Sequence, residues 1–574
     1  MAALEHEHVV HQQRTEGDDQ RWASIPQLMA WSAERFAACE AVVDGDVRLT
    51  YAELGAEVRR AGRAVVAAGL MPGERAALWA PNCAEWIVAA LGIAAAGGVV
   101  VPLNTRFVGP EARGILAASG ARMLFGVEDF VGRNLLSELR SADAEWTTSG
   151  ERLLTTRPVG APVHAVPVDT APVHTVVALR GEVPQGVLPW SDFLVSANGV
   201  ADDVLDARSA ALVPGDVCDI MFTSGTTGRP KGVMLTHGQT LRVFADWCEV
   251  VGLRHGDRYL ILNPFFHTFG YKAGIVASLM QGAVMVPMAS FDVDATFRTI
   301  ERERITVLPG PPAVFHSLLE SPARSEVDTS TLRLALTGAA TVPVELVRRM
   351  YAELSFDAVL TGYGLTETHG TATVCRVGDS PETVAQSCGR AIPGTEVKVV
   401  GPDGTTRPPG EPGEVLIRGY QVMRGYLDDP EATSEVVDGD GWLHSGDIGV
   451  LDEAGYLRIT DRLKDLFIVG GFNVYPAEVE QVLTGHQDVA HAAVVAMPDA
   501  RLGEVGAAYV VLRTGADATP IQLVEWCRAR MANFKVPRHV EIVTELPVGG
   551  TGKVDKVTLR ARAVSASKAP HHRG

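Results

Sequence analysis

One segment combines glycines, hydroxyl side chains and a lysine directly after an apolar run, a composition suited to binding phosphate. It reads IMFTSGTTGRPKG over residues 220–232. Glycines let backbone N–H groups approach phosphate oxygens, hydroxyls donate further hydrogen bonds, and a lysine adds positive charge. The spacing does not match a Walker A loop, and the alternative is an ordinary polar surface loop. The candidate phosphate contacts are Thr223, Ser224, Gly225, Thr226, Thr227, Gly228 and Lys231.

A second polar loop, YGLTE at residues 363–367, follows a short apolar run. In α/β folds ligands bind where strands end, so Thr366 and Glu367 could present a hydroxyl and a carboxylate to a ligand. A plain turn is the alternative. Residues 336–340, LTGAA, predict a strand that enters a loop of small residues, which alone indicates close packing. Asp447 in the segment SGD is, without context, typical of a local cap.

Three further residues stand in segments that could be functional or merely structural. His267 lies in the aromatic segment NPFFHTFG, where a histidine is more often packed in a core. Lys272 follows it and either faces solvent, pairs with an acid, or binds a polar group of a substrate. Lys553 lies in the glycine-rich segment LPVGGTGK, where a lysine is normally only a solvated charge.

The string TSGTTGRPKG at residues 223–232 resembles the phosphate loop of the adenylate-forming superfamily. This superfamily includes acyl-CoA synthetases, adenylation domains of peptide synthetases and firefly luciferase. The resemblance covers about residues 24–560, with the motifs in family order, and leaves out a loop at about 141–209 and both tails. It implies an acid:CoA ligase that uses ATP, Mg²⁺ and CoA. A carboxylate first attacks the α-phosphorus of ATP to give acyl-AMP and pyrophosphate, and the CoA thiol then displaces AMP.

The resemblance also implies roles for the residues around the nucleotide. Thr366 becomes a phosphate contact and Glu367 the Mg²⁺ ligand, in keeping with the preference of a hard cation for carboxylate oxygen. Asp447 becomes the acceptor for both ribose hydroxyls, and Arg462 a second contact to the ribose or a phosphate. The other implied contacts to the nucleotide or the acyl pocket are Gly338, Ala339, Ala340, Tyr363 and Gly364.

Four residues acquire roles in the reaction itself through the same resemblance. His267 would position the reacting carboxylate and gate access of the thiol. Lys464 occupies the hinge position about which the C-terminal domain rotates after the first half-reaction. Gly471, in GGFNVYP, would then help to form the tunnel for pantetheine, while Lys553 would bridge the carboxylate and the α-phosphate during adenylation. Its ammonium would stabilise charge in that transition state.

The prediction of which carboxylic acid the enzyme uses depends on longer sequence segments. The segments NPFFHTFGYKAGI, ERERITVLPGPPAVF, TLRLALTGAATVPVELV and DRLKDLFIVGGFNVYPAEVEQVL are most similar to an actinobacterial subgroup. This subgroup includes the ligase for the indanedione propanoate left after removal of the steroid A and B rings. The alternatives are a fatty-acid or aromatic-acid CoA ligase, or an adenylating enzyme that loads a carrier protein in trans. A luciferase-type oxidation is more remote. A binding protein without activity is disfavoured because Lys231, Glu367, Asp447, Arg462 and Lys553 are all present.

Composition restricts the remaining classes of function. The chain has 574 residues and a net charge of 51 − 69 = −18, so general electrostatic attraction to nucleic acid or an anionic membrane is not expected. Seven scattered cysteines without a CxxC motif argue against a disulfide framework or a zinc site and fit the cytoplasm. The polar N-terminus has no apolar core of a signal peptide. The uncharged run at 86–105 contains glycines and a proline, so it predicts a helix, a turn and a strand and no transmembrane segment. The oligomeric state stays open.

The pattern along the chain predicts an α/β fold of several units. Apolar helical stretches alternate with β-branched runs, which indicates parallel βαβ units. The expected helices are 51–70, 84–95 and 111–118, and the expected strands 75–79, 99–103 and 123–125. The alternation resumes over about 216–400. Short strands with tight turns at about 413–460 predict a small, mainly antiparallel β subdomain.

A compact α+β domain is expected after Lys464. Its predicted helices are 477–483 and 521–531, and its strands 489–496, 507–512 and 539–543. We therefore expect a disordered tail at 1–22, an N-terminal adenylation domain at 23–463, a mobile C-terminal domain at 464–560 and a second tail at 561–574. Within the first domain, residues 141–209 are expected to form a surface excursion, because prolines are frequent there and APVH occurs twice.

Overall fold

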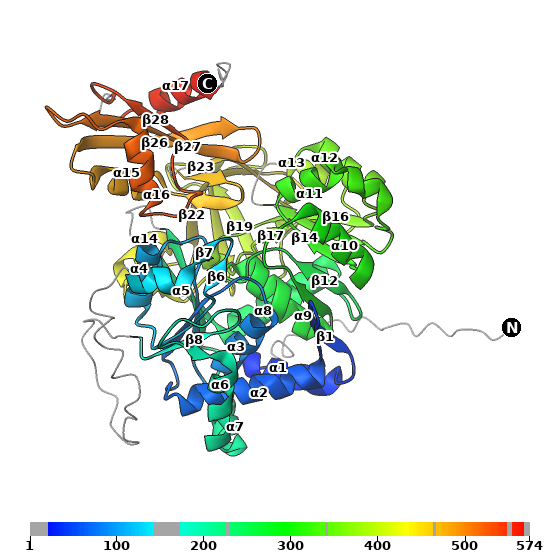
Figure 1. Cartoon of the computed structure of the whole chain (residues 1–574). Coiled ribbons are helices and arrows are strands. Elements are labelled where there is room, and N and C mark those ends of the chain that lie inside the picture. Colours follow the sequence, from blue (N-terminus) through cyan, green and yellow to red (C-terminus); the bar gives the residue numbers. More distant parts are fainter. Residues whose placement is uncertain are drawn as a thin grey trace.

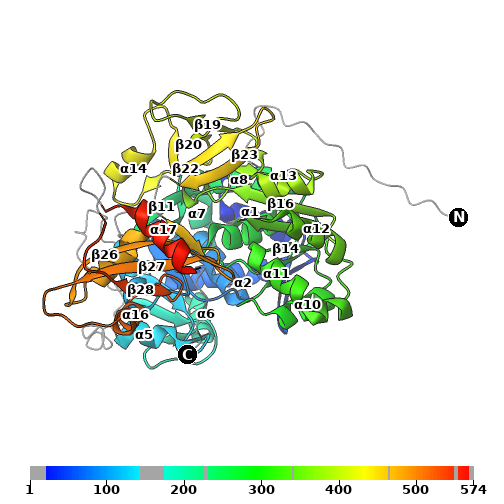
Figure 2. The ribbon, with the colours of Figure 1, turned by 90° about the horizontal axis from the view of Figure 1, so that it is seen from above.

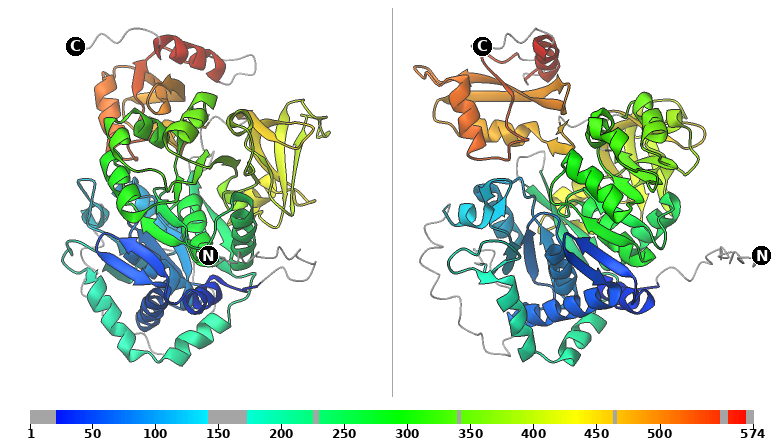
Figure 3. Two further views of the ribbon diagram at one scale, coloured as in Figure 1. Left: turned by 90° about the vertical axis from the view of Figure 1, so that its right-hand side faces the viewer. Right: turned by 45° about the vertical axis from the view of Figure 1, so that its right-hand side comes forward.

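A computed structural model describes residues 21–141, 173–224, 230–338, 342–462, 466–547 and 554–567. Two large sheets and their helices form the body of the molecule, a smaller antiparallel sheet lies beside them, and a C-terminal α+β unit lies above (Figures 1 and 3). The fold class predicted from the sequence is therefore confirmed. In the part of the chain that is described, every helix is too short or too polar to span a bilayer.

The first large sheet is mainly parallel, with antiparallel strands toward its edges. Parallel pairing runs without interruption from β16 to β1, so the strand ends that carry loops point to one edge. In spatial order its strands are β18 (Arg390–Ala391), β17 (Thr373–Val374), β16 (Ala358–Tyr363), β15 (Leu334–Gly338), β14 (Val307–Pro309), β12 (Arg258–Ile261), β13 (Val284–Pro287), β1 (Glu40–Asp44) and β2 (Val47–Thr50).

The second large sheet carries the phosphate-loop segment. Its centre is parallel, and β10 and β11 form an antiparallel hairpin toward one edge. Its strands are, in order, β21 (Gly425–Tyr426), β11 (Pro230–Thr236), β10 (Val217–Ser224), β4 (Val99–Pro102), β3 (Arg75–Trp79), β5 (Met123–Gly126), β8 (Thr175–Ala178) and β9 (Leu188–Pro189). The parallel β3, β4 and β5 confirm the predicted βαβ units.

Helices with apolar faces cover these sheets. Helix α2 (Tyr51–Ala67) begins with a capping box, in which Thr50 and Glu53 satisfy each other's free backbone N–H groups. Helix α3 (Ala84–Ala95) is buried along nearly its whole length, as its sequence, uncharged after Glu85, predicts. The other helices of this part are α1 (Ile25–Arg35), α4 (Gly109–Ser119), α5 (Leu135–Ser141), α6 (Trp190–Val195), α7 (Asp202–Ala210), α8 (His237–Val251), α9 (Ala277–Gln281), α10 (Val293–Glu303), α11 (Pro312–Glu320), α12 (Val344–Glu353), α13 (Pro381–Gln386) and α14 (Pro430–Val436).

The predicted β subdomain is a four-stranded antiparallel sheet. It consists of β19 (Thr395–Val400), β20 (Gly413–Gly419), β22 (Leu443–Leu451) and β23 (Leu457–Arg462).

The C-terminal unit has a hydrophobic core of its own, distinct from the main core. Its strands are β24 (Phe467–Val469), β25 (Phe472–Val474), β26 (Val489–Asp499), β27 (Gly503–Leu512) and β28 (His539–Ile542), and its helices α15 (Pro476–Thr484), α16 (Pro520–Arg528) and α17 (Lys556–Ser567). Helix α17 lies across the sheet (Figure 2) and packs Leu559 and Ala563 onto it.

Two expectations about the borders of the core are wrong. Residues 173–209 are not a surface excursion, since β8 extends the second large sheet next to β5 and α7 packs against α2. A strand of four residues gives too short a periodic signal to be found among prolines. Residues 561–567 are not a tail either, because they continue α17 and bury Ala563. Of the predicted N-terminal tail only Arg21 and Trp22 are described, and of the APVH repeat only Val173 and His174; the hinge at Lys464 lies outside the described residues.

Candidate active site

Two parallel strands of the first sheet carry, at neighbouring ends, segments predicted to contact the adenine and to hold magnesium. Gly338 at the end of β15 pairs in register with Gly362 in β16, so the loops that follow begin at the same edge. After β16 the chain enters a single 3₁₀ turn, Thr366–Thr368, which places Glu367 half-buried at that edge. The Met423 N–H donates to the Glu367 carbonyl at 2.8 Å and fixes the turn from the other side.

Tyr426 links Glu367 to Lys231, which the sequence places almost 140 residues earlier in the chain. Its hydroxyl donates to Oε1 of Glu367 at 2.7 Å, and Lys231 Nζ lies 4.9 Å from the centre of its ring. Burial and the nearby carboxylate raise the pKa of Tyr426 well above its usual value, so the hydroxyl remains a donor at neutral pH. Sequence reasoning missed Tyr426, because a tyrosine after a glycine carries no chemical signal by itself.

The strands of the phosphate-loop hairpin lie beside this pair. Thr223 faces Lys231 across the β10–β11 ladder, and Ser224 faces Pro230. Residues 225–229, with the predicted contacts Gly225, Thr226, Thr227 and Gly228, lie outside the described residues. The hairpin therefore places its lysine at the edge that also holds Glu367.

Asp447 reaches the same edge from the four-stranded sheet. It is 2% exposed and stands opposite Arg462 in the β22–β23 ladder. The Tyr363 hydroxyl donates to Oδ2 of Asp447 at 2.6 Å, and the Asp447 N–H donates to Oγ of Ser445 at 3.0 Å. A buried carboxylate held by fixed donors is suited to accepting hydrogen bonds from a sugar.

Gly364 joins these residues by close packing. A Cβ at this position would lie 2.4 Å from the carbonyl carbon of Gly370 and from the backbone nitrogen of Thr371. Only glycine lets the two arms of the loop approach so closely.

His267 is exposed, although protein atoms crowd its ring. The Phe269 N–H donates to Nδ1 at 3.2 Å, so the neutral ring carries its proton on Nε2. Desolvation by the surrounding protein atoms lowers the pKa of His267, which favours this neutral form. The histidine can therefore donate one hydrogen bond to a ligand, which suits the positioning of a carboxylate.

The segment around His267 is anchored to both neighbouring elements. The Thr268 hydroxyl contacts Sδ of Met221 in β10 at 3.2 Å, and Thr268 packs against Gly370 after β16. Gly270 is the second residue of a π-helix, Phe269–Val276, and a Cβ there would lie 2.1 Å from the carbonyl oxygen of Pro264. Such helices are frequent at functional sites.

Lys272 in this π-helix is fully buried and pairs with an acid, one of the three alternatives that its sequence left open. Its Nζ lies 2.9 Å from Oδ2 of Asp219 and donates to Oγ1 of Thr240 at 2.8 Å. The ammonium therefore joins the π-helix to β10 and is not presented to a substrate.

Gly471 of the C-terminal unit meets the main body close to His267. It forms the turn between β24 and β25 with φ of 89°, and a Cβ there would lie 3.8 Å from Pro311. The next residue, Phe472, stacks with Phe266 at 6.5 Å between ring centres. Of the other predicted residues, Ala339, Ala340, Lys464 and Lys553 lie outside the described part of the chain.

The donor set fits MgATP. Among the described residues, no group of three His, Cys, Asp or Glu side chains could hold an ion by itself. A single carboxylate, Glu367, beside a lysine matches Mg²⁺, which usually takes one or two carboxylates together with substrate phosphates. Glu367 would hold the ion and Lys231 the phosphates.

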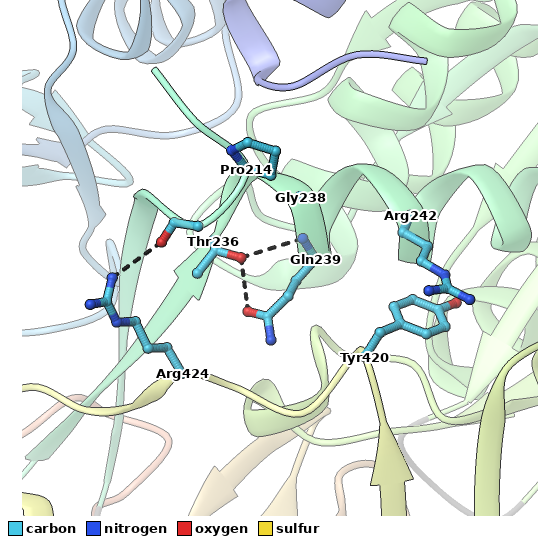
Figure 4. A pocket seen from close by; sticks show the side chains of 8 residues that line it. Pro214, Thr236, Gly238, Gln239, Arg242, Tyr420 and Arg424 are labelled. Atoms are coloured by element: carbon cyan, nitrogen blue, oxygen red, sulfur yellow. Dashed lines mark hydrogen bonds between the residues drawn. The ribbon is translucent and has the colours of Figure 1, made fainter. Parts of the chain in front are cut away.

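A hollow of about 500 Å³ lies elsewhere and does not belong to this site (Figure 4). It opens beside Thr236, at the end of β11 remote from Lys231. The polar groups around it have partners inside the protein: Arg424 donates to the Gly215 carbonyl at 3.1 Å, and Arg242 lies 4.0 Å from the centre of the Tyr420 ring.

Comparison with known proteins identifies the family. The sequence profile described as "AMP-binding enzyme" matches residues 29–427, and that described as "AMP-binding enzyme C-terminal domain" matches residues 478–553. The chain is 48% identical over 537 residues to the 3-[(3aS,4S,7aS)-7a-methyl-1,5-dioxo-octahydro-1H-inden-4-yl]propanoyl:CoA ligase of Rhodococcus jostii, covering 94% of this chain and 98% of the relative. It is also 48% identical to the ligase of the same name from Mycobacterium tuberculosis, over 91% and 95% of the two chains.

Solved structures of one enzyme, the o-succinylbenzoate CoA synthetase of Bacillus subtilis, match with different scores. A double mutant bound with the product analogue OSB-NCoA gives a TM-score of 0.74 at 27% identity, covering 93% of this chain and 98% of that one. The complex with AMP gives 0.60 at 26% identity, covering 92% and 96%. The arrangement of this chain is thus closer to that of the product-analogue complex. The resemblance read from the motifs is confirmed, and the chain belongs to the family of AMP-binding enzymes.

Proposed function

We propose that the protein is an ATP-dependent, AMP-forming acid:CoA ligase acting on a steroid-derived indanedione propanoate. The observation that carries the activity is the convergence of Lys231, Glu367 and Asp447 on one sheet edge, together with the neutral, exposed imidazole of His267. Lys231 supplies positive charge for the phosphates, and Glu367 supplies a ligand for magnesium. Asp447 supplies a hydrogen-bond acceptor for the ribose, and His267 a hydrogen-bond donor for the carboxylate of the acid. Their combination has no use in a simple binding protein and matches the chemistry of adenylation.

In the first half-reaction, a carboxylate oxygen of the acid attacks the α-phosphorus of ATP and pyrophosphate leaves. Lys231 and the hydroxyl of Thr366 hold the phosphates, Asp447 and Arg462 hold the ribose, and the Nε2–H of His267 orients the acid. Glu367 would hold Mg²⁺, which would supply positive charge against the phosphates. Lys553 bridges the carboxylate and the α-phosphate and stabilises the transition state.

In the second half-reaction, the CoA thiol attacks the acyl carbon, loses its proton, and AMP leaves. The C-terminal domain, residues 464–560, turns about Lys464 between the two steps, so that Lys553 withdraws and the Gly471 turn approaches. The contact of Gly471 with Pro311 and the higher TM-score to the product-analogue complex support the assignment of the described arrangement to this second step.

The choice of acid is supported by the two 48% identical relatives, which both carry the indanedione propanoate in their names. We also propose a cytoplasmic location, which the seven free cysteines support. ATP, CoA and the acid are then the partners of the enzyme.

The test is a panel of acids assayed with ATP, Mg²⁺ and CoA. We expect a bicyclic keto acid with a propanoate side chain to give the highest kcat/KM, above a long linear fatty acid and an aromatic acid such as ferulate. Better turnover of either competitor would refute the substrate and leave the ligase class intact. Acyl-AMP formation without transfer to free CoA would instead indicate an enzyme that loads a carrier protein.

A further inference from the structure

Lys535 of the C-terminal domain is buried between two glutamates that belong to different domains. Its Nζ donates to Oε1 of Glu478 at 2.6 Å, within its own domain, and to Oε1 of Glu111 at 2.7 Å, in helix α4 of the N-terminal domain. The lysine side chain is 3% exposed, and its Nζ also lies 4.6 Å from the ring centre of Phe107. The cation therefore sits inside the domain interface, away from the candidate active site.

The ion pair between Lys535 and Glu111 can open while each of the two groups keeps another partner. Oε2 of Glu111 accepts a hydrogen bond from the Val108 N–H at 3.0 Å, so this carboxylate keeps a partner when the C-terminal domain leaves. Lys535 keeps Glu478, which moves with it. Of the two ion pairs described for Lys535, the one with Glu111 crosses the interface, and both groups become accessible to water once it opens.

An aromatic column next to Lys535 connects this contact to the acyl site. Phe534 stacks on Phe472 at 4.8 Å between ring centres, and Phe472 stacks on Phe266, the residue before His267. Phe534 directly precedes Lys535, and Phe472 directly follows Gly471. Because the two rings stack on each other, the position of Lys535 fixes the Gly471 turn beside Phe266.

We propose that Lys535 is a positioning residue for thioester formation, which locks the C-terminal domain onto Glu111 so that the Gly471 turn stays against the acyl site. This inference rests on the proposed two-step reaction. Three contacts across the interface fix an orientation better than one: the ion pair of Lys535 with Glu111, its cation–π contact with Phe107, and the stack of Phe472 on Phe266. Adenylation needs the other arrangement and does not use this contact.

The charges also explain why a lysine stands at this position. Without its ammonium, Glu111 and Glu478 would face each other at a buried interface, and two close carboxylates repel strongly where water is excluded. Burial already raises the pKa of Glu111, and the two carboxylates raise the pKa of Lys535. Removing the lysine therefore opens the interface and does more than delete a bond.

The test measures the two half-reactions separately in Lys535→Met, Glu111→Gln and the double variant. We expect Lys535→Met to slow conversion of supplied acyl-AMP and CoA to the thioester about tenfold or more, a typical loss for a buried charge contact at an interface. Release of pyrophosphate in the first turnover should stay within about twofold of wild type. Glu111→Gln, on the other domain, should impair the same step, which guards against misfolding of the C-terminal domain as the cause.

A double-mutant cycle and a matched control sharpen the result. If the two residues act as one contact, adding Glu111→Gln to Lys535→Met should change thioester formation by no more than about twofold. Arg562→Met removes a half-exposed cation that is paired with Glu541 within the same domain, and both half-reactions should be unchanged. Equal losses in both half-reactions, or additive losses in the double variant, would overturn the proposal.

Hydrogen exchange supplies a readout that does not depend on the substrate. In the enzyme without ligands, the amides of β25 (Phe472–Val474) should exchange faster in Lys535→Met and Glu111→Gln than in wild type, and not faster in Arg562→Met. Unchanged exchange would refute the lock. If wild-type enzyme activates none of the acids, the proposed function fails, while the exchange experiment still decides whether Lys535 holds the domains together.

Discussion

Replacing Tyr426 by Phe removes one hydroxyl group from the candidate site and leaves its neighbours in place. The hydroxyl donates to the Glu367 carboxylate at 2.7 Å, and the ring that remains still lies beneath Lys231. A hydrogen bond to a charged group contributes about 1.5–3 kcal/mol. If this energy orients Glu367 for magnesium in the transition state, its loss slows adenylation by roughly 10- to 150-fold. The Mg²⁺ concentration for half-maximal rate should rise in the same variant.

The assay is pyrophosphate release titrated with magnesium chloride, followed by conversion of supplied acyl-AMP with CoA. The second reaction involves no pyrophosphate and should stay within about twofold of wild type. Tyr456→Phe is a matched control, since its hydroxyl donates to Asp379 at 2.6 Å outside the candidate site. An unchanged magnesium requirement in Tyr426→Phe, or an equal loss in Tyr456→Phe, would show that Tyr426 does not orient a metal ligand.

Three further predictions concern buried groups and stability. Lys272→Met leaves the Asp219 carboxylate buried without its cation and should lower the free energy of unfolding by about 3–5 kcal/mol. Adding Asp219→Asn should recover most of this loss. Urea unfolding measures both variants, and no recovery in the double variant would contradict the pairing. Burial lowers the pKa of His237 from 6.5 to about 4, so its neutral form stabilises the fold fully above pH 6.5, and about 3 kcal/mol is lost as pH falls to 4. His237→Gln should lack this pH dependence; an identical pH profile would refute the assignment. Gly364→Ala forces a Cβ to 2.4 Å from backbone atoms and should destabilise the protein by about 1–3 kcal/mol in thermal unfolding. Gly199→Ala is the control, because the space around its Cβ is open and its stability should not change. Equal effects of the two substitutions would contradict this reasoning.

The regular elements were predictable where one physical signal dominates. The helix at 84–95 and the strand at 75–79 have the predicted bounds, because an uncharged Ala-rich run and a short apolar run each have one compatible structure. The antiparallel β subdomain followed from alternation and tight turns. By contrast, β8 (Thr175–Ala178) is only four residues long, and its place beside β5 is decided by pairing with a distant strand.

The candidate site was predictable only in part, for a related reason. Glu367 and Asp447 could be proposed from the sequence because their motifs are local and resemble those of a family. Tyr426 and Lys535 were missed because their meaning arises from contacts across the chain: Lys535 and Glu111 are 424 residues apart in sequence. Local patterns predict elements and motifs, whereas a bridging side chain becomes visible only when the fold brings its partners together.

The position of Lys535 bears on how one domain serves two chemical steps. In the described arrangement, the Gly471 turn touches Pro311, and Lys535 is bound by Glu111 of the opposite domain. A rigid domain cannot keep this contact and also turn another of its surfaces toward the same site. If Lys553 acts from such a surface, as proposed, adenylation breaks the bond to Glu111 and thioester formation restores it. Lys535 keeps its ion pair with Glu478, and Glu111 keeps its hydrogen bond from the Val108 N–H. Neither charge therefore loses all its partners when the domain turns. The lock can then bias the domain toward thioester formation without trapping it there.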